Sequence, residues 1–423
     1  MSRSVQTPSK AFAFPNEWQP VRLGSIGKTY GGLTGKSGED FNTGSASYVT
    51  FMQVMGNSRL REPAKGTVNI NPGERQNHVQ KDDLLFNGSS ETPEEVALAA
   101  AVDFHPDSDT FLNSFCFGFR LLPDAPADSL FLAYLFRSSV GRNLVSSLAQ
   151  GATRYNISKT QLLNQAIHLP PKAEQIAIRE KLTDAEELIN SLERLISKKH
   201  AIKQGMMQEL LTGRTRLAGF TAPWTDIVLG DVSRFSKGSG LPKSALTTSG
   251  STPCIHYGEL FTSYGPEILH VKSRTNLADR TVVSEDLDVL MPTSDVTPRG
   301  LAKASSIHGR GVVLGGDILI IRPDAIRAYG PFLAHVIRRD ADQVLKLVRG
   351  STVYHLYASD MQNFTLAIPS VEEQRAIADA LLAAECEIEA LRLRLTKARE
   401  IKTGMMQELL TGRTRLPVEE VSS

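Results

Sequence analysis

Residues 203–217 read KQGMMQELLTGRTRL, and residues 402–416 read KTGMMQELLTGRTRL. The one difference between them is Gln204 against Thr403. The likeness continues upstream without a gap from Pro170 against Pro369, and about 26 of roughly 48 positions are identical. An internal repeat of this quality decides the architecture before any local pattern does, so we expect the chain to consist of two related halves.

The segments that precede these two shared blocks are related more faintly. DLLF at 83–86 corresponds to DVLM at 288–291, FLAY at 131–134 to FLAH at 332–335, and GATRY at 151–155 to GSTVY at 350–354. The chain is therefore predicted to alternate a variable domain with a shared block, twice. The predicted boundaries are 1–168 and 218–367 for the variable domains, 169–217 and 368–416 for the shared blocks, and 417–423 for a tail.

Each shared block is predicted to be a long helix of about 35 residues, on the order of 50 Å in length. Apolar residues alternate steps of four and three, which is the spacing of a heptad seam. The predicted seam residues are Ile178, Leu182, Ile189, Leu192 and Ile196 in the first block, and Ile377, Leu381, Ile388, Leu391 and Leu395 in the second. Pro170 and Pro369 suit a helix start, and Gly213 and Gly412 suit a left-handed stop. Because the two seams match, we expect the helices to pair as an antiparallel coiled coil; the alternative is a core helix within one globular domain.

The variable domains are predicted to be mixed α/β (α+β). Short β-branched or apolar runs are punctuated by Gly, Pro, Ser and Asn, as at 48–51, 281–283 and 311–321. Helices are predicted at 131–148 and 331–347. The expected fold class is thus two α/β (α+β) domains in tandem, separated and followed by long α-helices, with a pseudo-twofold internal repeat.

Composition is that of an ordinary globular protein of 423 residues. Lys and Arg number 47 against 46 Asp and Glu, which excludes a basic tail protein but leaves room for a local basic face. The three cysteines lie far apart, which favours a reducing compartment. We find no signal-peptide core and no run near the ~18 apolar residues of a membrane span, so we expect a cytoplasmic protein without a membrane partner.

Motifs for catalysis are missing. GGLTGKS at 31–37 resembles a phosphate loop, but Tyr30 stands where the first glycine is required. No Gly-x-Gly-x-x-Gly is present for a dinucleotide, and the nine histidines form no metal pair with a cysteine. We therefore predict that this chain carries no catalytic residue, no metal and no cofactor of its own.

The remaining polar residues favour DNA recognition. Turn-rich stretches mix Lys and Arg with Ser, Thr, Asn and Tyr, and several recur at equivalent points of both halves. Cationic and hydroxyl side chains hold phosphates, while Arg, Asn and Ser also bond to base edges. The predicted DNA-binding residues are Lys36, Arg59, Arg61, Ser89, Arg154, Tyr155 and Asn156 in the first half, and Lys237, Lys243, Lys272, Arg274, Ser294, Thr352 and Tyr354 in the second.

The ends of the two shared blocks are apolar enough to bind a partner subunit. The residues predicted for this interface are Met206, Met207, Leu210 and Leu211, with Met405, Met406, Leu409 and Leu410 in the second copy. The alternative is that the two helix ends pack against each other.

This set of features resembles the specificity (S) subunit of a type I restriction–modification system, over nearly the whole chain. The resemblance rests on the domain starts Trp18…Leu23-Gly24 and Trp224…Leu229-Gly230, on the helix openings Pro170…Glu174-Gln175 and Pro369…Glu373-Gln374, and on the paired GMMQELLTGR blocks.

The resemblance implies two target recognition domains, each reading one half of a bipartite asymmetric site in double-stranded DNA, with the helices as a spacer. It also implies two methyltransferase subunits docked on this chain and two restriction (motor) subunits that join for cleavage. S-adenosylmethionine, ATP and Mg would then belong to those partners, and this chain would direct adenine methylation and ATP-dependent cleavage without catalysing either.

Other interpretations stay open at this point. One is a coiled-coil adaptor with two heads that bind proteins rather than DNA. Another is the specificity subunit of a type II-like (IIB or IIG) system.

Overall fold

Each shared block folds as a single uninterrupted helix: α6 spans Lys172–Leu210 and α11 spans Val371–Leu409. The structure is a computed structural model that describes residues 14–151, 153–277 and 281–417. Just beyond the two helices, Gly213 and Gly412 have φ of 69° and 71°, the left-handed conformation predicted for these stops. The predicted tail lies outside the described residues except for Pro417.

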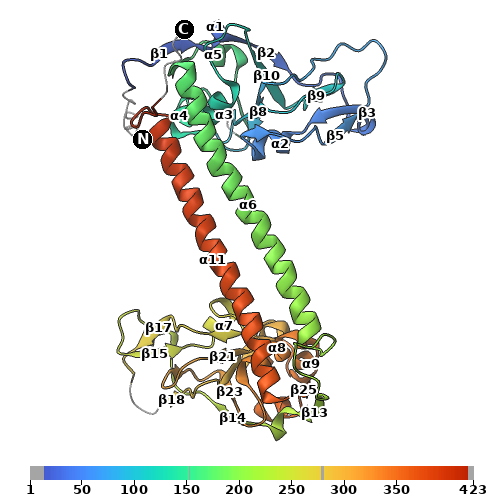
Figure 1. Cartoon of the computed structure of the whole chain (residues 1–423), viewed down its shortest axis with the longest axis vertical. Helices are drawn as coiled ribbons and strands as arrows, with labels where there is room; N and C mark the ends of the chain where they lie inside the picture. The colour runs from blue at the N-terminus through green and yellow to red at the C-terminus, as the bar shows by residue number, and fades with distance from the viewer. Residues whose placement is uncertain (1–13, 152, 278–280, 418–423) are drawn as a thin grey trace. The chain divides into compact units, whose positions relative to one another are not determined.

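The contacts divide the chain into two units, and both long helices contribute to each. The first unit holds the described residues up to 192 and those from 394 onward, and the second holds 193–393. Within a unit, a segment of α6 lies beside a segment of α11 (Figure 1). Each variable domain is thus grouped with parts of both helices, and the linear boundaries drawn from the sequence stay a prediction.

Ion pairs show how the helices run within the second unit. Lys199 Nζ lies 2.7 Å from Glu387 Oε1, and Lys203 pairs with Glu385 one turn further along α6. As the number rises on α6 it falls on α11, so the two segments are antiparallel, as the matched seams predicted.

Most of the predicted seam is buried. Ile196 and Leu395 are the exceptions and are partly exposed. Ile178 and Leu182 pack into the core of the first variable domain, and Ile377 and Leu381 into that of the second. The start of each seam therefore holds a domain on its helix.

The first unit is built on a five-stranded sheet in the order β2-β10-β6-β8-β4, with a three-stranded sheet β5-β3-β9 and two small ladders, β1-β12 and β7-β11. Its strands are β1 Gln19–Arg22, β2 Gly27–Gly31, β3 Phe41–Val49, β4 Arg59–Leu60, β5 Gly66–Val68, β6 Leu84–Asn87, β7 Ser89–Ser90, β8 Ala99–Val102, β9 Thr110–Leu112, β10 Cys116–Leu121, β11 Tyr155–Asn156 and β12 Ala166–Leu169. Its shorter helices are α1 Leu23–Ile26, α2 Phe51–Gly56, α3 Ser129–Arg137, α4 Ser139–Ser146 and α5 Lys159–Leu163.

The second unit repeats this plan. A five-stranded sheet has the order β14-β23-β19-β21-β16, beside a four-stranded sheet β17-β15-β22-β18 and the ladders β13-β25 and β20-β24. Its strands are β13 Thr225–Val228, β14 Ser233–Lys237, β15 Thr252–Ile255, β16 Glu267–Ile268, β17 Ser273–Thr275, β18 Val282–Val283, β19 Val289–Pro292, β20 Ser294–Asp295, β21 Ser305–Ile307, β22 Val313–Leu314, β23 Ile318–Pro323, β24 Tyr354–His355 and β25 Thr365–Ile368. Its shorter helices are α7 Glu259–Thr262, α8 Gly330–Arg339, α9 Ala341–Leu347 and α10 Ala358–Met361.

The DLLF and DVLM motifs enter the middle strand of each five-stranded sheet. Asp83 accepts hydrogen bonds of 2.8 and 2.7 Å from Arg120, and Asp288 accepts two of 2.8 Å from Arg322. Both carboxylates are almost fully buried, and burial of a charge is tolerated when a bidentate arginine satisfies it. The fold class predicted from the sequence, two tandem α/β (α+β) domains with long helices, is confirmed.

The glutamine of each helix opening joins its helix to the domain before it. Gln175 accepts from the Asp128 N–H at 2.9 Å and donates to the Pro126 and Pro170 carbonyls. Gln374 makes the same kind of contacts in the second unit, accepting from the Tyr329 N–H at 2.8 Å. Both side chains are fully buried, so the amide supplies the donors and the acceptor that these backbone groups need.

Candidate nucleic-acid interface

In the first unit, the small ladder β7-β11 brings together four of the predicted DNA-binding residues. Ser89 lies opposite Asn156 and Ser90 lies opposite Tyr155, with Arg154 directly before β11. Arg154 and Asn156 are exposed and Tyr155 is half-buried. Ser89 is only 5% exposed and its Oγ is buried, so its predicted role as a DNA contact is corrected for this conformation.

A glycine makes the turn that precedes this ladder. Gly151 has φ of 138°, and a Cβ there would lie 2.0 Å from the Arg154 carbonyl oxygen. Gly350 has φ of 119°, and a Cβ there would lie 2.2 Å from the Val353 carbonyl oxygen. The GATRY and GSTVY motifs are therefore the same tight turn, which presents the next side chains at the edge of each domain.

Two residues that sequence reasoning missed lie at this end of the sheet. Phe115 is 55% exposed, and the guanidinium carbon of Arg154 lies 5.3 Å from its ring centroid. Lys159 is exposed, with Nζ 6.0 Å from the ring centroid of Phe117 in β10. Within the described part of the chain neither cation pairs with a carboxylate, so both are available to phosphates.

The second unit has the corresponding ladder, β20-β24, with different side chains. Ser294 lies opposite His355 and Asp295 lies opposite Tyr354, while Thr352 belongs to the turn before β24. The Thr293 N–H donates to the Asp317 carbonyl at 2.9 Å, as the Gly88 N–H donates to that of Phe115 at 2.7 Å. Asp317 therefore takes the place of Phe115, and its carboxylate lies 3.3 Å from Lys237 Nζ.

Three cations predicted to bind DNA in the first unit are engaged inside it. Lys36 Nζ lies 2.6 Å from Glu74 Oε2 and its side chain is only 2% exposed. The hydrogen bond from Lys36 lowers the pKa of the Glu74 carboxyl to about 2, so Glu74 is ionised at neutral pH. Arg59 donates from Nε to Asp103 at 2.5 Å, and both Arg59 and Arg61 contact Glu187 of α6. The prediction is corrected for Lys36, whose buried ammonium group is compensated by Glu74; for the partly exposed Arg59 and Arg61, the carboxylate partners weigh against a phosphate contact.

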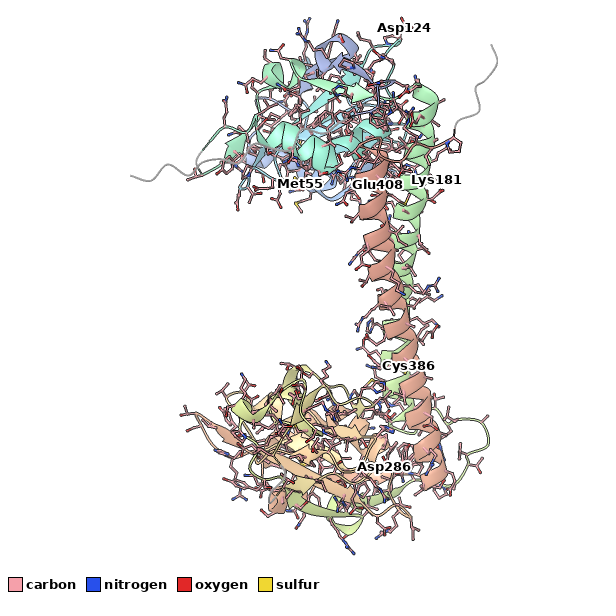
Figure 2. All side chains as sticks on the ribbon, turned by 90° about the vertical axis from the view of Figure 1, so that its left-hand side faces the viewer. Met55, Asp124, Lys181, Asp286, Cys386 and Glu408 are labelled. Carbon is pink, nitrogen blue, oxygen red and sulfur yellow. The ribbon has the colours of Figure 1, made fainter. Side chains whose placement is uncertain are left out.

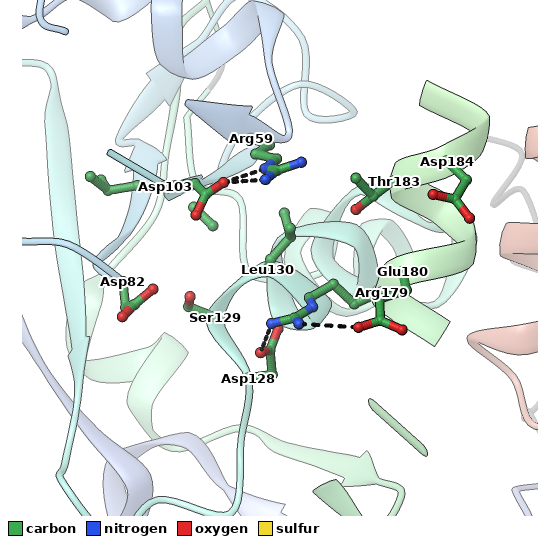
Figure 3. A pocket seen from close by; sticks show the side chains of 12 residues that line it. Arg59, Asp82, Asp103, Asp128, Ser129, Leu130, Arg179, Glu180, Thr183 and Asp184 are labelled. Carbon is green, nitrogen blue, oxygen red and sulfur yellow. Dashed lines mark hydrogen bonds and ion pairs between the residues drawn. The ribbon is translucent and has the colours of Figure 1, made fainter. Parts of the chain in front are cut away.

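The hollow beside Arg59 is acidic and does not suit a phosphate backbone. It has a volume of about 210 Å³ and lies between the first variable domain and α6. Figure 3 shows Arg59 directed at Asp103 and Arg179 directed at Asp128 and Glu180. The lining carboxylates, which outnumber the arginines, are Asp82, Asp103, Asp128, Glu180 and Asp184.

The other cations predicted in the second unit lie outside the β20-β24 ladder: Arg274 in β17, Lys272 directly before β17, and Lys243 in a short 3-10 turn. Arg274 of β17 donates to the Gly250 and Ser251 carbonyls at 2.5 and 2.7 Å, so it holds a loop and is corrected to a structural residue. Lys243 and Lys272 are exposed and stay predictions, as do Lys237, Ser294, Thr352 and Tyr354.

The helix ends predicted to bind a partner pack inside the chain. Leu409 and Leu410 belong to the core of the first unit, and Leu210 and Leu211 to that of the second, each at most 5% exposed. The prediction is therefore corrected for these four leucines; the alternative, that the two ends pack on each other, is also wrong, because each end enters a variable domain. Met206, Met207, Met405 and Met406 are partly buried against the same cores.

No arrangement for catalysis is evident within the described residues. They contain no group of three or more His, Cys, Asp or Glu side chains that could hold a metal. Burial raises the pKa of the Cys116 thiol to about 12 and that of Cys254 to about 11, so neither is a thiolate nucleophile at neutral pH. Cys386 lies exposed on α11 (Figure 2). In the same part of the chain, no helix is both long enough and apolar enough to cross a membrane.

Comparison with known families decides between the interpretations left open by the sequence. The family model for the type I restriction modification DNA specificity domain matches residues 15–203 and again residues 222–394. The chain belongs to this family. Each specificity domain thus covers one variable domain and much of the helix that follows it.

A curated relative extends over almost the whole chain. It is a protein of Methanocaldococcus jannaschii with the provisional name type I restriction enzyme MjaX specificity subunit. It is 25% identical over 429 residues, which cover 95% of each protein.

Solved structures of specificity subunits share the fold. The S subunit of a type I restriction–modification system from M. genitalium matches with a TM-score of 0.58 and 16% identity, over 95% of this chain and 98% of that one. The HsdS subunit from Thermoanaerobacter tengcongensis matches with a TM-score of 0.50 and 19% identity, over 96% and 99%. In both matches the two specificity domains and the helices are covered together.

Membership of the specificity family gives the function in outline. The chain recognises DNA sequence within a type I restriction–modification complex, as a non-catalytic component that assembles with other subunits. A protein-binding adaptor and a type II-like subunit are not favoured by these matches. Within each specificity domain, the ladder and its glycine turn remain the best candidates for the DNA-reading surface.

Proposed function

We propose that the two specificity domains each read one half of a bipartite, asymmetric site in double-stranded DNA. The first would use the surface around β7, β11, Phe115 and Lys159, and the second the surface around β20, β24 and Lys237. The observation that carries this proposal is the recurrence of one ladder and one glycine turn in both domains with different exposed side chains. A common scaffold with different contact residues suits two half-sites of different sequence.

The long helices would set the distance between the half-sites and dock two methyltransferase subunits. Exposed apolar residues at heptad spacing on α6, Leu195 and Ile202, support a role of the helix surface in docking. Two restriction subunits would join this core for cleavage. S-adenosylmethionine, ATP and Mg would act in those partners, and the complex would work in the cytoplasm, where its DNA is.

A genome-wide map of methylated adenines tests this proposal. The chain is co-expressed with its methyltransferase subunit in a host that lacks adenine methylation, and N6-methyladenine is sequenced genome-wide. We expect one bipartite motif with a fixed unspecified spacer. Replacing residues 1–168 by another first domain should then change one half of the motif and leave the other half intact. Folded, co-purifying subunits that methylate no bipartite motif would refute the proposal.

A further inference from the structure

Phe115 is an exposed aromatic ring on a rigid backbone. Among the described residues of the first unit it is the one aromatic side chain more than half exposed. Its N–H donates to Asn113 Oδ1 at 2.9 Å, and its carbonyl accepts from the Gly88 N–H at 2.7 Å. The next N–H, that of Cys116, bonds to the Asn113 carbonyl at 2.9 Å. The backbone thus holds the ring outside the domain core, where it costs hydration free energy unless it binds something.

A cation covers one side of this ring. The guanidinium carbon of Arg154 lies 5.3 Å from the Phe115 centroid, and Lys159 approaches the same sheet end. In the apolar core of a protein–protein interface, charged residues are depleted. A ring with two cations beside it is therefore unsuited to such a core. It suits nucleic acid, in which stacked bases adjoin phosphates.

The second specificity domain lacks this pair. Asp317 stands in place of Phe115, and Val353 in place of Arg154. Asp317 is paired with Lys237 at 3.3 Å, so this position carries charge rather than an aromatic ring. The fold of the domain therefore does not require an aromatic residue at this position. A contact with a molecule outside the domain then explains why Phe115 is aromatic and exposed.

We propose that Phe115 is a base-contacting residue of the first specificity domain: its ring enters the first half-site against the bases, and Arg154 holds the adjoining phosphate. Phenylalanine is one of the side chains that proteins insert between base steps, where it partly unstacks them. This inference rests on the proposed function, since it assigns how one domain reads its half-site.

Methylation mapping tests it in the assembled complex. Phe115→Ala should lower methylation at sites of the wild-type motif and relax the bases of the first half, while the second half stays fixed. Phe115→Trp, which keeps an aromatic ring, should retain the motif. Leu122→Ala is the matched control, because Leu122 is an exposed apolar residue just beyond the other end of β10.

A direct binding assay separates the contribution of the Phe115 ring from that of the Arg154 charge. On a duplex with 2-aminopurine in the first half-site, the wild-type complex should raise the fluorescence and Phe115→Ala should abolish the rise. Affinity should fall between about fivefold and about 150-fold, the range found when an aromatic ring that stacks on a base is truncated. Arg154→Gln should weaken binding mainly through its salt dependence.

The outcomes distinguish the inference from the function it rests on. If the wild type yields a bipartite motif but Phe115→Ala methylates and binds like Leu122→Ala, Phe115 is no base contact. If Phe115→Ala reduces co-purification of the methyltransferase subunit and leaves DNA binding intact, the ring belongs to a protein interface and the inference is overturned. If the wild type yields no bipartite motif, the proposed function itself fails.

Discussion

Arg216 holds Glu373 through two parallel hydrogen bonds of 2.5 Å, from Nε to Oε1 and from Nη2 to Oε2, although 157 residues separate the two in sequence. Arg415 holds Glu174 in the same way, at 2.5 and 2.7 Å. The arginine that follows one long helix thus fastens the start of the other. Both glutamates are almost fully buried, so each depends on its arginine for compensation.

Arg216→Gln should therefore destabilise the second unit, because it leaves the Glu373 carboxylate buried without its partner. We expect a lower midpoint of thermal unfolding. Arg214→Gln is the matched control, since Arg214 lies in the same TGRTR motif but is exposed. The exchange Arg216→Glu with Glu373→Arg should recover part of the loss; equal midpoints for the Arg214 and Arg216 variants would contradict the role assigned to the pair.

Tyr134 and His335 occupy equivalent positions of the two units, but only the Tyr134 side chain makes a hydrogen bond. The Tyr134 hydroxyl donates to Glu186 at 2.9 Å, and Glu186 also accepts from Ser58 and from Lys402 at 2.6 Å. Burial alone would raise the pKa of Glu186, but these partners, Lys402 above all, lower it overall. His335 is 2% exposed and neither ring nitrogen makes a hydrogen bond in the described structure, although Glu267 Oε1 lies 3.5 Å from its Nε2.

His335→Tyr should accordingly stabilise the second unit. It removes an unsatisfied buried polar group, which costs about 1–3 kcal/mol, and the adjoining cavity of about 550 Å³ gives the phenol room to reach Glu385. The reverse change, Tyr134→His, should destabilise the first unit. Chemical denaturation of both variants measures the two effects, and a fall in stability for His335→Tyr would show that the contact of His335 with Glu267 outweighs the new hydrogen bond.

His308 should make the stability of the second unit depend on pH. Its Nε2 lies 2.8 Å from Glu267 Oε2, and this hydrogen bond raises the pKa of His308, with Asp286 and Asp379 adding to the effect. A histidine with a raised folded pKa contributes stability that is complete below about pH 6.5 and is lost as the pH rises through the folded value.

The thermal midpoint of the wild type should therefore fall more between about pH 6 and about pH 8 than that of His308→Gln. The comparison removes the contributions of the other histidines, which both proteins share. An identical pH dependence in the two proteins would mean that His308 titrates at its ordinary value.

The repeat was enough to predict the architecture, because two blocks so similar in sequence form the same element, and heptad spacing with proline and glycine at the ends specifies a long helix. What the pattern did not reveal is which partner each side chain meets. Leu210 and Leu410 look like an exposed apolar end until the variable domain that covers them is in place. Arg61 looks like a free cation until Glu187 of α6 is placed beside it. These contacts join residues that are far apart in sequence, and periodicity along the chain does not predict them.

The candidate interface was predictable in part for the same reason. The glycine turn before Tyr155 leaves a local mark in the sequence, since a positive φ and a close backbone approach require glycine. Phe115 leaves none: a phenylalanine beside a strand is most simply a core residue, and only the fold shows that it is exposed. The pattern of polar residues therefore indicates the glycine turn before Tyr155 but not the ring of Phe115.

Salt dependence should separate cations that meet DNA from cations that hold the fold. Lys159 is exposed and lies over Phe117 without a carboxylate partner in the described structure, whereas Arg61 is engaged by Glu187. Each phosphate contact contributes about 0.9 to the slope of log affinity against log salt. Lys159→Ala should therefore weaken binding to a duplex bearing the first half-site and make the slope shallower by about one. Arg61→Ala should leave the slope unchanged, because Glu187 compensates the charge of Arg61 within the protein.

Fluorescence anisotropy over a range of salt concentrations measures both slopes with the assembled complex. A slope reduced by Arg61→Ala and not by Lys159→Ala would move the DNA-binding surface away from β7 and β11 and toward the side of the domain that faces α6.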